Sequence, residues 1–269
     1  MTSATQFAQK KLLDHTLGLA AYTMPTAWLG LFKASPGETG SLANEVSGGS
    51  YARVSITALM AATVLGTGIA TNSAAIGFAS PTAAWGTLTH WGVCDASTAG
   101  NALLYGQLAS NMVVASGSLG PSFVPGTLSI TAPSTSSPFA TQYLAKKLLD
   151  HLLGKAAFTM PTAVYLALFS SDPGATGSLA GEIAVGGYGR QIVTPVMDAT
   201  VLTTGIASSN DVIQFPTPTA NYSVTHLGVA DALTSGNVLL RKARGSTLSV
   251  VSGGSRVRID AGKLALQVA

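Results

Sequence analysis

The stretch QKKLLDHTLGLAAYTMPTAWLGLFKASPGETGSLANEV, residues 9–46, returns as AKKLLDHLLGKAAFTMPTAVYLALFSSDPGATGSLAGEI at residues 145–183. The likeness continues through TLTHWGVCDASTAGNALL, residues 87–104, and SVTHLGVADALTSGNVLL, residues 223–240. A repeat of about 136 residues is too long for a solenoid and has the size of a domain. The chain is therefore a tandem duplication.

The positions of the repeats predict the domain organisation. Residues 132–140, APSTSSPFA, are rich in Pro, Ser and Thr, which is typical of a linker. We therefore expect a first repeat at residues 1–131, a linker at residues 132–140 and a second repeat at residues 141–269. Each half is long enough to bury a core of its own.

Each repeat opens with a helical pattern and continues with strand patterns. Thr5 and Thr141 are suitable N-caps, leucines form an apolar stripe, and Gly18 and Gly154 stand where a C-cap belongs. After TMPTA, short runs rich in β-branched residues alternate with Gly, Pro, Asn, Asp and Ser. The predicted fold class is mainly β: two homologous β-sandwich or barrel-like domains, each opened by a short α-helix.

Composition narrows the classes of partner. Only 9% of the 269 residues are charged, against about 25% in an average protein. A surface with so few charges favours association, and two similar domains per chain would let a trimer present six modules. The net charge is +3, and no segment has the density of basic residues that neutralising nucleic-acid phosphates requires. Nucleic acid is therefore not expected as a partner.

No membrane insertion or export is expected. The most apolar stretch, residues 56–79, is interrupted by Thr, Gly, Asn and Ser, which indicates buried strands. The N-terminal residues lack the apolar run of a secretory signal, so we expect synthesis in the cytoplasm.

The polar residues that occur in both repeats are the candidates for inherited chemistry. They are Lys11/Lys147, Asp14/Asp150, His15/His151, Glu45/Glu182, Arg53/Arg190, His90/His226, Asp95/Asp231 and Asn101/Asn237.

Structural interpretations of these residues are favoured over chemical ones. The histidines are expected to bond to backbone, with metal binding or acid–base chemistry as the alternative. Glu45 and Arg53 flank a glycine pair and predict an ion pair across a turn. Asp95 and Asn101 suit a turn better than a calcium site. Cys94, the only cysteine, is expected to be buried and inert. We predict no catalytic residue, metal site or cofactor.

Residues that differ between the repeats are the candidates for partner binding. Tryptophans in strands mostly belong to the core, which is the favoured interpretation. Trp85 nevertheless lies in a loop-like segment of the first repeat, where an exposed indole would be able to stack on a sugar. The second repeat carries a basic set that the first lacks and that would suit an acidic neighbour or acidic surface glycans. This set comprises Arg241, Lys242, Arg244, Arg256 and Arg258.

The motifs KLLDH, MPT, DP, a glycine-rich turn before Tyr-x-Arg, H-x-G-x-x-D-A and G-N-x-L-L resemble a family of small virion proteins. These proteins occur in tailed bacteriophages and prophages and are usually labelled tail fibre proteins. The resemblance covers nearly all of each half, whereas family members are commonly one module long. It implies a structural or attachment role in a virion, after synthesis in the host cytoplasm, and it brings no catalytic residues.

The sequence thus predicts a non-enzymatic phage structural protein of the tail, neck or fibre apparatus, a homo-oligomer that contacts other virion proteins. A capsid decoration protein is one alternative. A glycan-binding receptor module is another, and would require Trp85 to be exposed. An enzyme would require His15, His90 and their acidic partners to converge in a cleft.

Overall fold

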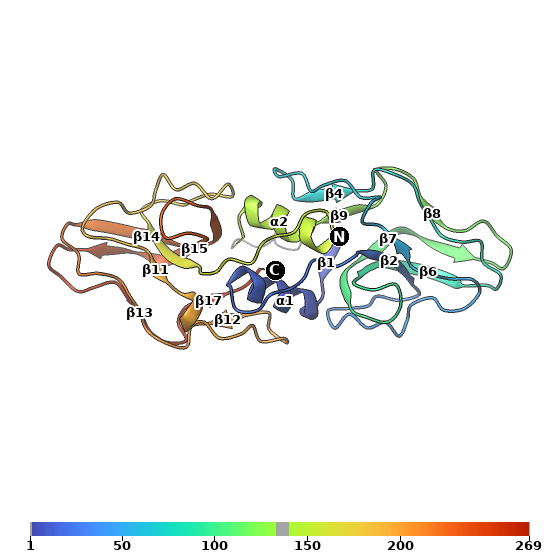
Figure 1. The fold of residues 1–269 in the computed structure, drawn as a ribbon, viewed down its shortest axis with the longest axis horizontal. Coiled ribbons are helices and arrows are strands. Elements are labelled where there is room, and N and C mark those ends of the chain that lie inside the picture. Colours follow the sequence, from blue (N-terminus) through green and yellow to red (C-terminus); the bar gives the residue numbers. More distant parts are fainter. Residues whose placement is uncertain (1, 133–139, 269) are drawn as a thin grey trace. The chain divides into compact units, whose positions relative to one another are not determined.

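The computed structural model describes residues 2–132 and 140–268. Elements of the first repeat are β1 (Thr2–Ala4), α1 (Gln6–Thr16), β2 (Trp28–Phe32), β3 (Val54–Ser55), β4 (Ile69–Thr71), β5 (Ile76–Gly77), β6 (Gly86–Cys94), β7 (Ala102–Val114), β8 (Ser122–Phe123) and β9 (Ser129–Thr131). Elements of the second are α2 (Gln142–Leu152), β10 (Tyr165–Phe169), β11 (Gln191–Ile192), the 3-10 helix η1 (Thr194–Val196), β12 (Ala207–Ser208), β13 (Ile213–Gln214), β14 (Tyr222–Ala230), β15 (Val238–Val250), β16 (Arg258–Ile259) and β17 (Ala265–Leu266). The two series correspond in order, except that β1 has no strand and η1 no 3-10 helix as its counterpart (Figure 1).

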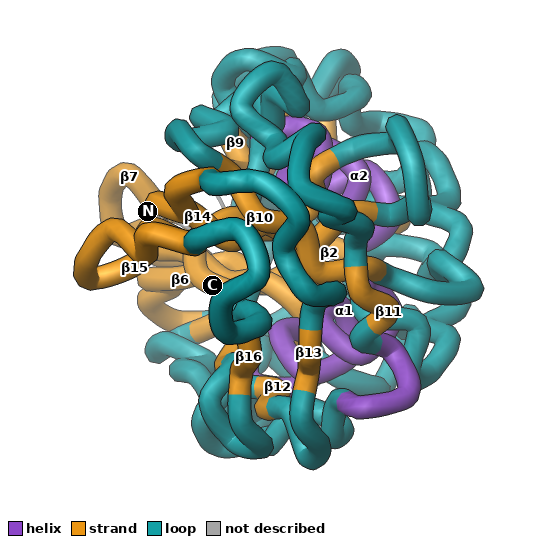
Figure 2. The backbone as a smooth tube through the Cα atoms, turned by 90° about the vertical axis from the view of Figure 1, so that its left-hand side faces the viewer, coloured by secondary structure: helices purple, strands orange, loops and turns teal. Residues whose placement is uncertain are grey.

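Each repeat builds one main antiparallel sheet. The strand order is β1-β7-β6-β2-β3 in the first repeat and β11-β10-β14-β15 in the second. An isolated bridge between Ala140 and Leu240 takes the place that the β1–β7 pairing of Ala4 with Leu104 has in the first repeat. The longest strands, β7 and β15, each bulge out of their ladder partway along, and Figure 2 draws them in orange as strands that protrude from the rest of the backbone.

Short ladders supply a second layer in each repeat. These ladders are β4–β9 and β5–β8 in the first repeat, and β12–β17 and β13–β16 in the second. In the second repeat, Leu264 and Leu266 face Leu166 and Leu240 of the main sheet across a cavity of only about 20 Å³. The prediction of a mainly β chain with two homologous tandem domains, each opened by a short helix, is confirmed.

One aromatic ring per repeat explains the glycine of the H-x-G motif. Phe32 and Phe169 are fully buried at the ends of β2 and β10. A Cβ atom at Gly92 or Gly228 would lie within 2.8 Å of the ring of Phe32 or Phe169. Because interiors are close-packed, a side chain at either glycine would displace the ring.

The helix ends are fixed as the sequence predicts. The hydroxyl group of Thr5 accepts a hydrogen bond from the Ala8 amide (3.3 Å), and Thr141 accepts one from Leu144 (3.4 Å). At the C-terminus of α1, the Gly18 and Leu19 amides donate to His15 and Asp14 carbonyls. Gly18 and Gly154 both adopt positive φ, so they end the helices in Schellman motifs.

The compact units of the chain exchange their helices. Unit 1 comprises Met1–Gln9, Thr23–Pro133 and Lys146–Phe158, and unit 2 comprises Lys10–Tyr22, Ser134–Ala145 and Thr159–Ala269. Most of α1 therefore belongs to the unit built from the second repeat, and most of α2 to the unit built from the first. The units differ from the sequence repeats in this one element.

An aspartate anchors each exchanged helix in its unit. In unit 1, Oδ1 of Asp150 accepts the backbone N–H of Thr63 (2.7 Å), and Lys146 pairs with Oδ2 (2.5 Å). In unit 2, Oδ1 of Asp14 accepts the backbone N–H of Thr200 (2.7 Å), and Lys10 pairs with Oδ2 (2.9 Å). Both carboxylates are buried, so these bonds satisfy charges that water does not reach.

A second contact fixes the end of each exchanged helix. Lys155 donates to the Thr57 carbonyl of unit 1 (2.9 Å), and the Thr194 hydroxyl donates to the Leu17 carbonyl in unit 2 (2.9 Å). Gly154 lies so close to the Pro25 carbonyl of unit 1 that a Cβ atom there would approach within 2.8 Å. The helix ends are therefore fitted to the loops they meet.

The expected linker at residues 132–140 falls largely on residues 133–139, which lie outside the described residues. Among the helices that the structure describes, none has the length and apolar character needed to cross a membrane.

Replacing Asp150 by alanine leaves the buried Thr63 amide without its acceptor, so the free energy of unfolding should fall by about 1–3 kcal/mol. Chemical denaturation measures this change. Asp260→Ala removes a carboxylate that pairs with Arg258 in an exposed position and should have little effect. Equal losses in the two variants would contradict the anchoring role.

The stability should also fall in acid. Burial acts to raise the pKa of Asp150, but hydrogen bonds from Lys146 and Thr63 outweigh it and lower the pKa. The folded protein therefore binds this proton less tightly than the unfolded chain, and the contribution present above the unfolded pKa is lost as pH falls through the folded pKa. Denaturation of the wild type and Asp150→Ala should converge at low pH.

Residues 1–132 alone should not form a stable monomer, because this fragment lacks the helix segment Lys146–Phe158 that completes unit 1. Light scattering and circular dichroism should show an unfolded chain or a dimer. Co-expression with residues 134–269 should restore a folded complex. A folded monomer of the fragment would show that α1 can complete its own unit and that folding of unit 1 does not require the exchanged helix.

Candidate functional site

A carboxylate, a phenol and a guanidinium form the most extensive polar cluster of each unit. In unit 1, Arg53 donates from Nε and Nη2 to the two carboxylate oxygens of Glu45, at 2.7 and 2.6 Å. Tyr51 donates to Oε1 of Glu45 (2.9 Å) and accepts the Leu31 amide (3.0 Å). The predicted ion pair is confirmed.

The remaining guanidinium nitrogen ties this cluster to a turn. Nη1 of Arg53 donates to the carbonyls of Ala96 (2.7 Å) and Ala99 (2.8 Å). In unit 2, Arg190 makes the corresponding bonds to Glu182, Ala232 and Ser235. The cluster thus joins the glycine-rich turn to the turn that follows β6 or β14.

Electrostatics favour the protonated forms of the phenol and the guanidinium in this cluster. Burial, together with the negative charge of Glu45, raises the pKa of the Tyr51 phenol. Burial acts to lower the pKa of Arg53, but the hydrogen bond to Glu45 and the favourable charge interactions with its neighbours together raise the pKa. A protonated phenol, a carboxylate and a guanidinium that are bonded to one another form a structural clip rather than an acid–base pair.

The histidines are dispersed. Nδ1 of His15 accepts the Tyr22 amide (3.0 Å), and Nδ1 of His151 accepts the Phe158 amide (3.1 Å), so each ring closes a helix-end loop. His90 contacts the Thr89 hydroxyl (2.7 Å), and burial lowers its pKa. His15 belongs to unit 2, whereas His90 belongs to unit 1.

The turn residues Asp95 and Asn101 bond to one another. Oδ1 of Asp95 accepts the Asn101 amide (2.7 Å) and Oδ2 accepts its side-chain Nδ2 (2.8 Å), and Asp231 and Asn237 repeat this pattern. Within residues 2–132 and 140–268, no group of three or more His, Cys, Asp or Glu side chains is placed to hold a metal ion.

Cys94 is buried in the cluster of Phe32 and Ala102. Burial raises the pKa of its thiol to about 12. The thiol is therefore protonated near neutral pH and is a poor nucleophile.

Trp85 is buried, so its candidate role as an exposed, sugar-stacking residue is wrong, and the core position favoured for the tryptophans applies to it. Its side chain is 2% exposed, and its Nε1 donates to the Gly49 carbonyl (3.0 Å). The indole also packs edge-on against Tyr51, with ring centroids 5.3 Å apart. Trp85 thus belongs to the core of unit 1, because its one polar atom finds a backbone partner there.

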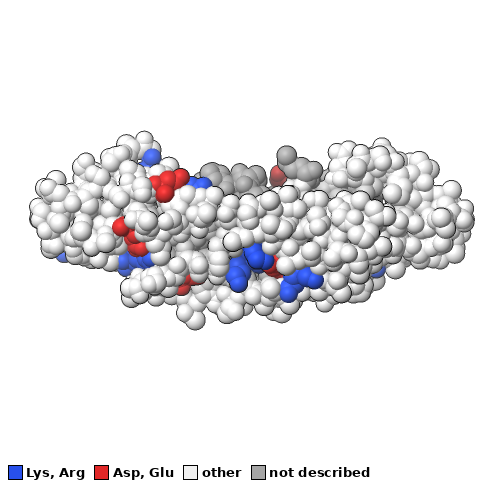
Figure 3. All heavy atoms as spheres, turned by 90° about the horizontal axis from the view of Figure 1, so that it is seen from above, with Lys and Arg blue, Asp and Glu red and all other residues white. Residues whose placement is uncertain are grey.

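The basic residues singled out in the second repeat lie in different settings. Arg241 pairs with Asp172 (2.8 Å) and Arg258 with Asp260 (2.6 Å), while Arg256 donates to the Thr217 hydroxyl (2.8 Å). Arg258 belongs to the β13–β16 ladder, whereas Lys242 and Arg244 lie on β15 of the main sheet. Figure 3 shows charged side chains in a few small groups on a largely uncharged face.

Lys242 and Arg244 line a hollow of about 300 Å³ together with Lys263. Sequence reasoning singled out the first two residues and missed Lys263, which follows a turn near the end of the chain. The alignment of the repeats carries the signal, because Lys263 in AGKL takes the place of Thr127 in PGTL.

The fold and these clusters define a class of protein: a duplicated, mainly β structural protein whose polar residues common to both repeats hold its own turns and helix ends. The particular family follows from comparison with family models. The model described as Podophage GP4 fiber I protein gp80 matches residues 3–131 and again residues 139–267. The chain belongs to this family and carries its module twice, which confirms the resemblance seen in the sequence. A comparison with curated proteins finds no match.

Replacing Arg190 by alanine should lower the free energy of unfolding by about 3 kcal/mol, because Glu182, whose side chain is only 15% exposed, would keep its charge without its cationic partner. Arg241→Ala is the matched control: it removes an arginine from a pair whose aspartate is 47% exposed, and should cost less than about 1 kcal/mol. Urea denaturation of both variants measures the difference. A small loss for Arg190→Ala would contradict the structural role of the clip.

Proposed function

We propose that this protein is a non-enzymatic subunit of the tail, neck or fibre apparatus of a bacteriophage virion and acts by assembly and surface contacts. The observation that carries the proposal is the family match over both repeats. The family is named for a fibre protein, and a fibre protein works through contacts with other virion proteins.

The use of the polar residues supports a structural role. Glu45, Arg53, Asp14 and Asp150 each bond to groups of their own unit. A general acid or base needs a positioned titratable group that can reach a substrate. These side chains are instead occupied in fixing turns and helices, as a durable particle component requires.

The duplication supports an assembly role. In a ring-shaped homo-oligomer of such chains, the number of homologous modules is twice the number of chains. A trimer would therefore present six modules. A charged fraction of 9% lowers the electrostatic barrier between packed copies. Light scattering on the purified protein tests this part of the proposal, and a monomeric mass would count against it.

Immunogold electron microscopy of intact virions tests the location. A polyclonal antibody against this protein should label the tail, neck or fibres, and antibody preabsorbed with the protein should leave the particles unlabelled. Label spread over the head would instead favour capsid decoration. Virions that bind no gold while the same antibody detects the protein in infected cells would contradict a virion role.

A further inference from the structure

Both units break the ladder of their longest hairpin in the same way. In unit 2, Val224 pairs with Leu248 and His226 with Ala243, so residues 244–247 oppose the single residue Thr225. In unit 1, Leu88 pairs with Met112 and His90 with Gln107, so residues 108–111 oppose Thr89. The extra residues leave the ladder and form a wide bulge, and bulges often accompany functional sites.

A hollow lies beside each bulge. In unit 1 it measures about 420 Å³ and is lined in part by Trp91, Gln107, Leu108, Ser110 and Thr127. In unit 2 it measures about 300 Å³ and is lined by Leu227, Lys242, Ala243, Arg244, Gly245, Ser246, Lys263, Leu264 and Ala265. Ala243, Arg244, Ser246 and Lys263 take the places of Gln107, Leu108, Ser110 and Thr127, so the two hollows occupy equivalent places.

The hollows differ because of coupled substitutions. Trp91 faces Gly106 across the β6–β7 ladder, and a Cβ atom at Gly106 would overlap the indole ring. In unit 2 the smaller Leu227 faces Lys242. Exchanging the indole for a leucine therefore makes room for a lysine, and Arg244 and Lys263 add two further cations to the same lining.

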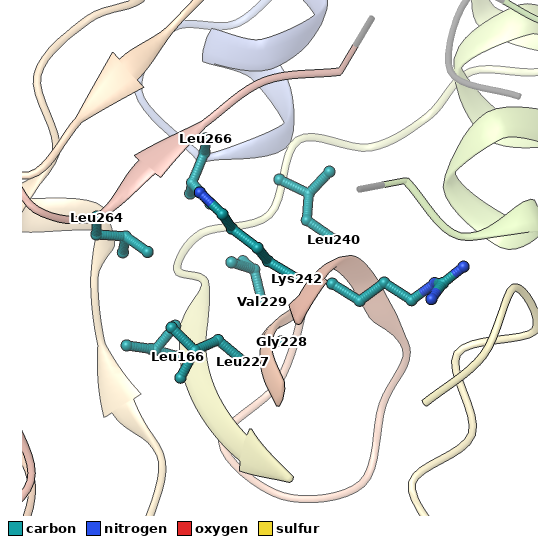
Figure 4. A pocket seen from close by; sticks show the side chains of 9 residues that line it. Leu166, Leu227, Gly228, Val229, Leu240, Lys242, Leu264 and Leu266 are labelled. Atoms are coloured by element: carbon teal, nitrogen blue, oxygen red, sulfur yellow. The ribbon is translucent and has the colours of Figure 1, made fainter. Parts of the chain in front are cut away.

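The side chain of Lys242 is exposed at the border of the small apolar cavity. Figure 4 shows its methylene chain beside the leucines of that cavity, with the amino nitrogen reaching toward Leu266. Lysines at the border of apolar surfaces commonly lay their methylene groups on the surface and keep the ammonium group in water. Arg244 is held within the bulge by donation from Nε to the Ser246 carbonyl (3.3 Å).

Three of the nine residues that line the hollow of unit 2 are thus cationic, and none of those described is acidic. This density stands out in a chain of which 9% is charged. A concave site concentrates the field of the charges that line it. An anion placed there gains charge-assisted hydrogen bonds from lysine and arginine donors.

We propose that the hollow of unit 2 binds an anionic sugar residue, one that carries a carboxylate or phosphate group. Its volume is at the lower end of the range for ligand pockets and suits one sugar ring. The half-buried Leu227 and Ala265 offer an apolar surface to the ring, Ser246 offers a hydroxyl group, and the cations of the lining take the charged substituent. The equivalent hollow of unit 1 offers an indole, an amide and hydroxyl groups without charge, which suits a neutral sugar better.

Titration of the isotope-labelled full-length protein, followed by nuclear magnetic resonance, tests the proposal. The probes are glucuronate and glucose 6-phosphate, with glucose as the neutral control. Both anionic probes should shift amide signals of residues 242–246 and 263–265, weakening as salt is added. Arg244→Leu/Lys263→Thr, which installs the counterparts from unit 1, should weaken binding about tenfold or more.

Arg256→Gln/Arg258→Gln is the matched control, because it removes two cations of the same unit outside the hollow. It should bind the anionic probes like the wild type. Equal weakening in both double variants would overturn the site in favour of a general field effect. Three outcomes would each overturn the anionic sugar as ligand. The protein would bind inorganic phosphate as tightly as glucose 6-phosphate, or glucose as tightly as glucuronate. It would otherwise bind a short polyglutamate peptide and none of the sugars. These outcomes leave the location of the protein in the virion unaffected.

Discussion

A buried carboxylate that reaches from a helix to a backbone amide holds each unit together. Asp150 bonds to Thr63, and Asp14 bonds to Thr200, at equal distances of 2.7 Å. In each pair, the aspartate that accepts the bond and the threonine that donates it come from different sequence repeats. Because each unit is completed by a helix that the other repeat encodes, the duplication and the fold depend on one another. A single repeat would have to obtain this helix from a second copy.

This constraint accounts for much of the polar chemistry that the repeats share. The N-cap threonines, the helix-end glycines and the helix-end histidines define where the exchanged helices begin and end. The Glu–Tyr–Arg clips then fix the turns of each unit. These positions are alike in both repeats because each helix meets equivalent loops. The two repeats differ where residues take no part in the helix exchange, as in the hollows beside β7 and β15.

The sequence predicts the local structure well because local signals suffice for it. Thr5, Gly18 and the Glu45–Arg53 pair act over a few residues, and their roles are readable from spacing. The helix exchange is not readable, because Asp14 and Asp150 have the same neighbours and would satisfy Thr63 equally well. The sequence leaves the exposed alternative for Trp85 open because its partner, the Gly49 carbonyl, is 36 residues away. Lys263 joins Lys242 only through the pairing of distant strands, which composition does not reveal.

The helix exchange can be tested at single amides. In the labelled protein, Asp14→Asn should shift the backbone amide signal of Thr200 strongly and leave that of Thr63 in place, and Asp150→Asn should do the reverse. The reason is that each amide donates to one of these carboxylates, and a neutral acceptor changes its shielding. If Asp14→Asn instead moved Thr63 and spared Thr200, each helix would lie in the unit of its own repeat, and the account would be wrong.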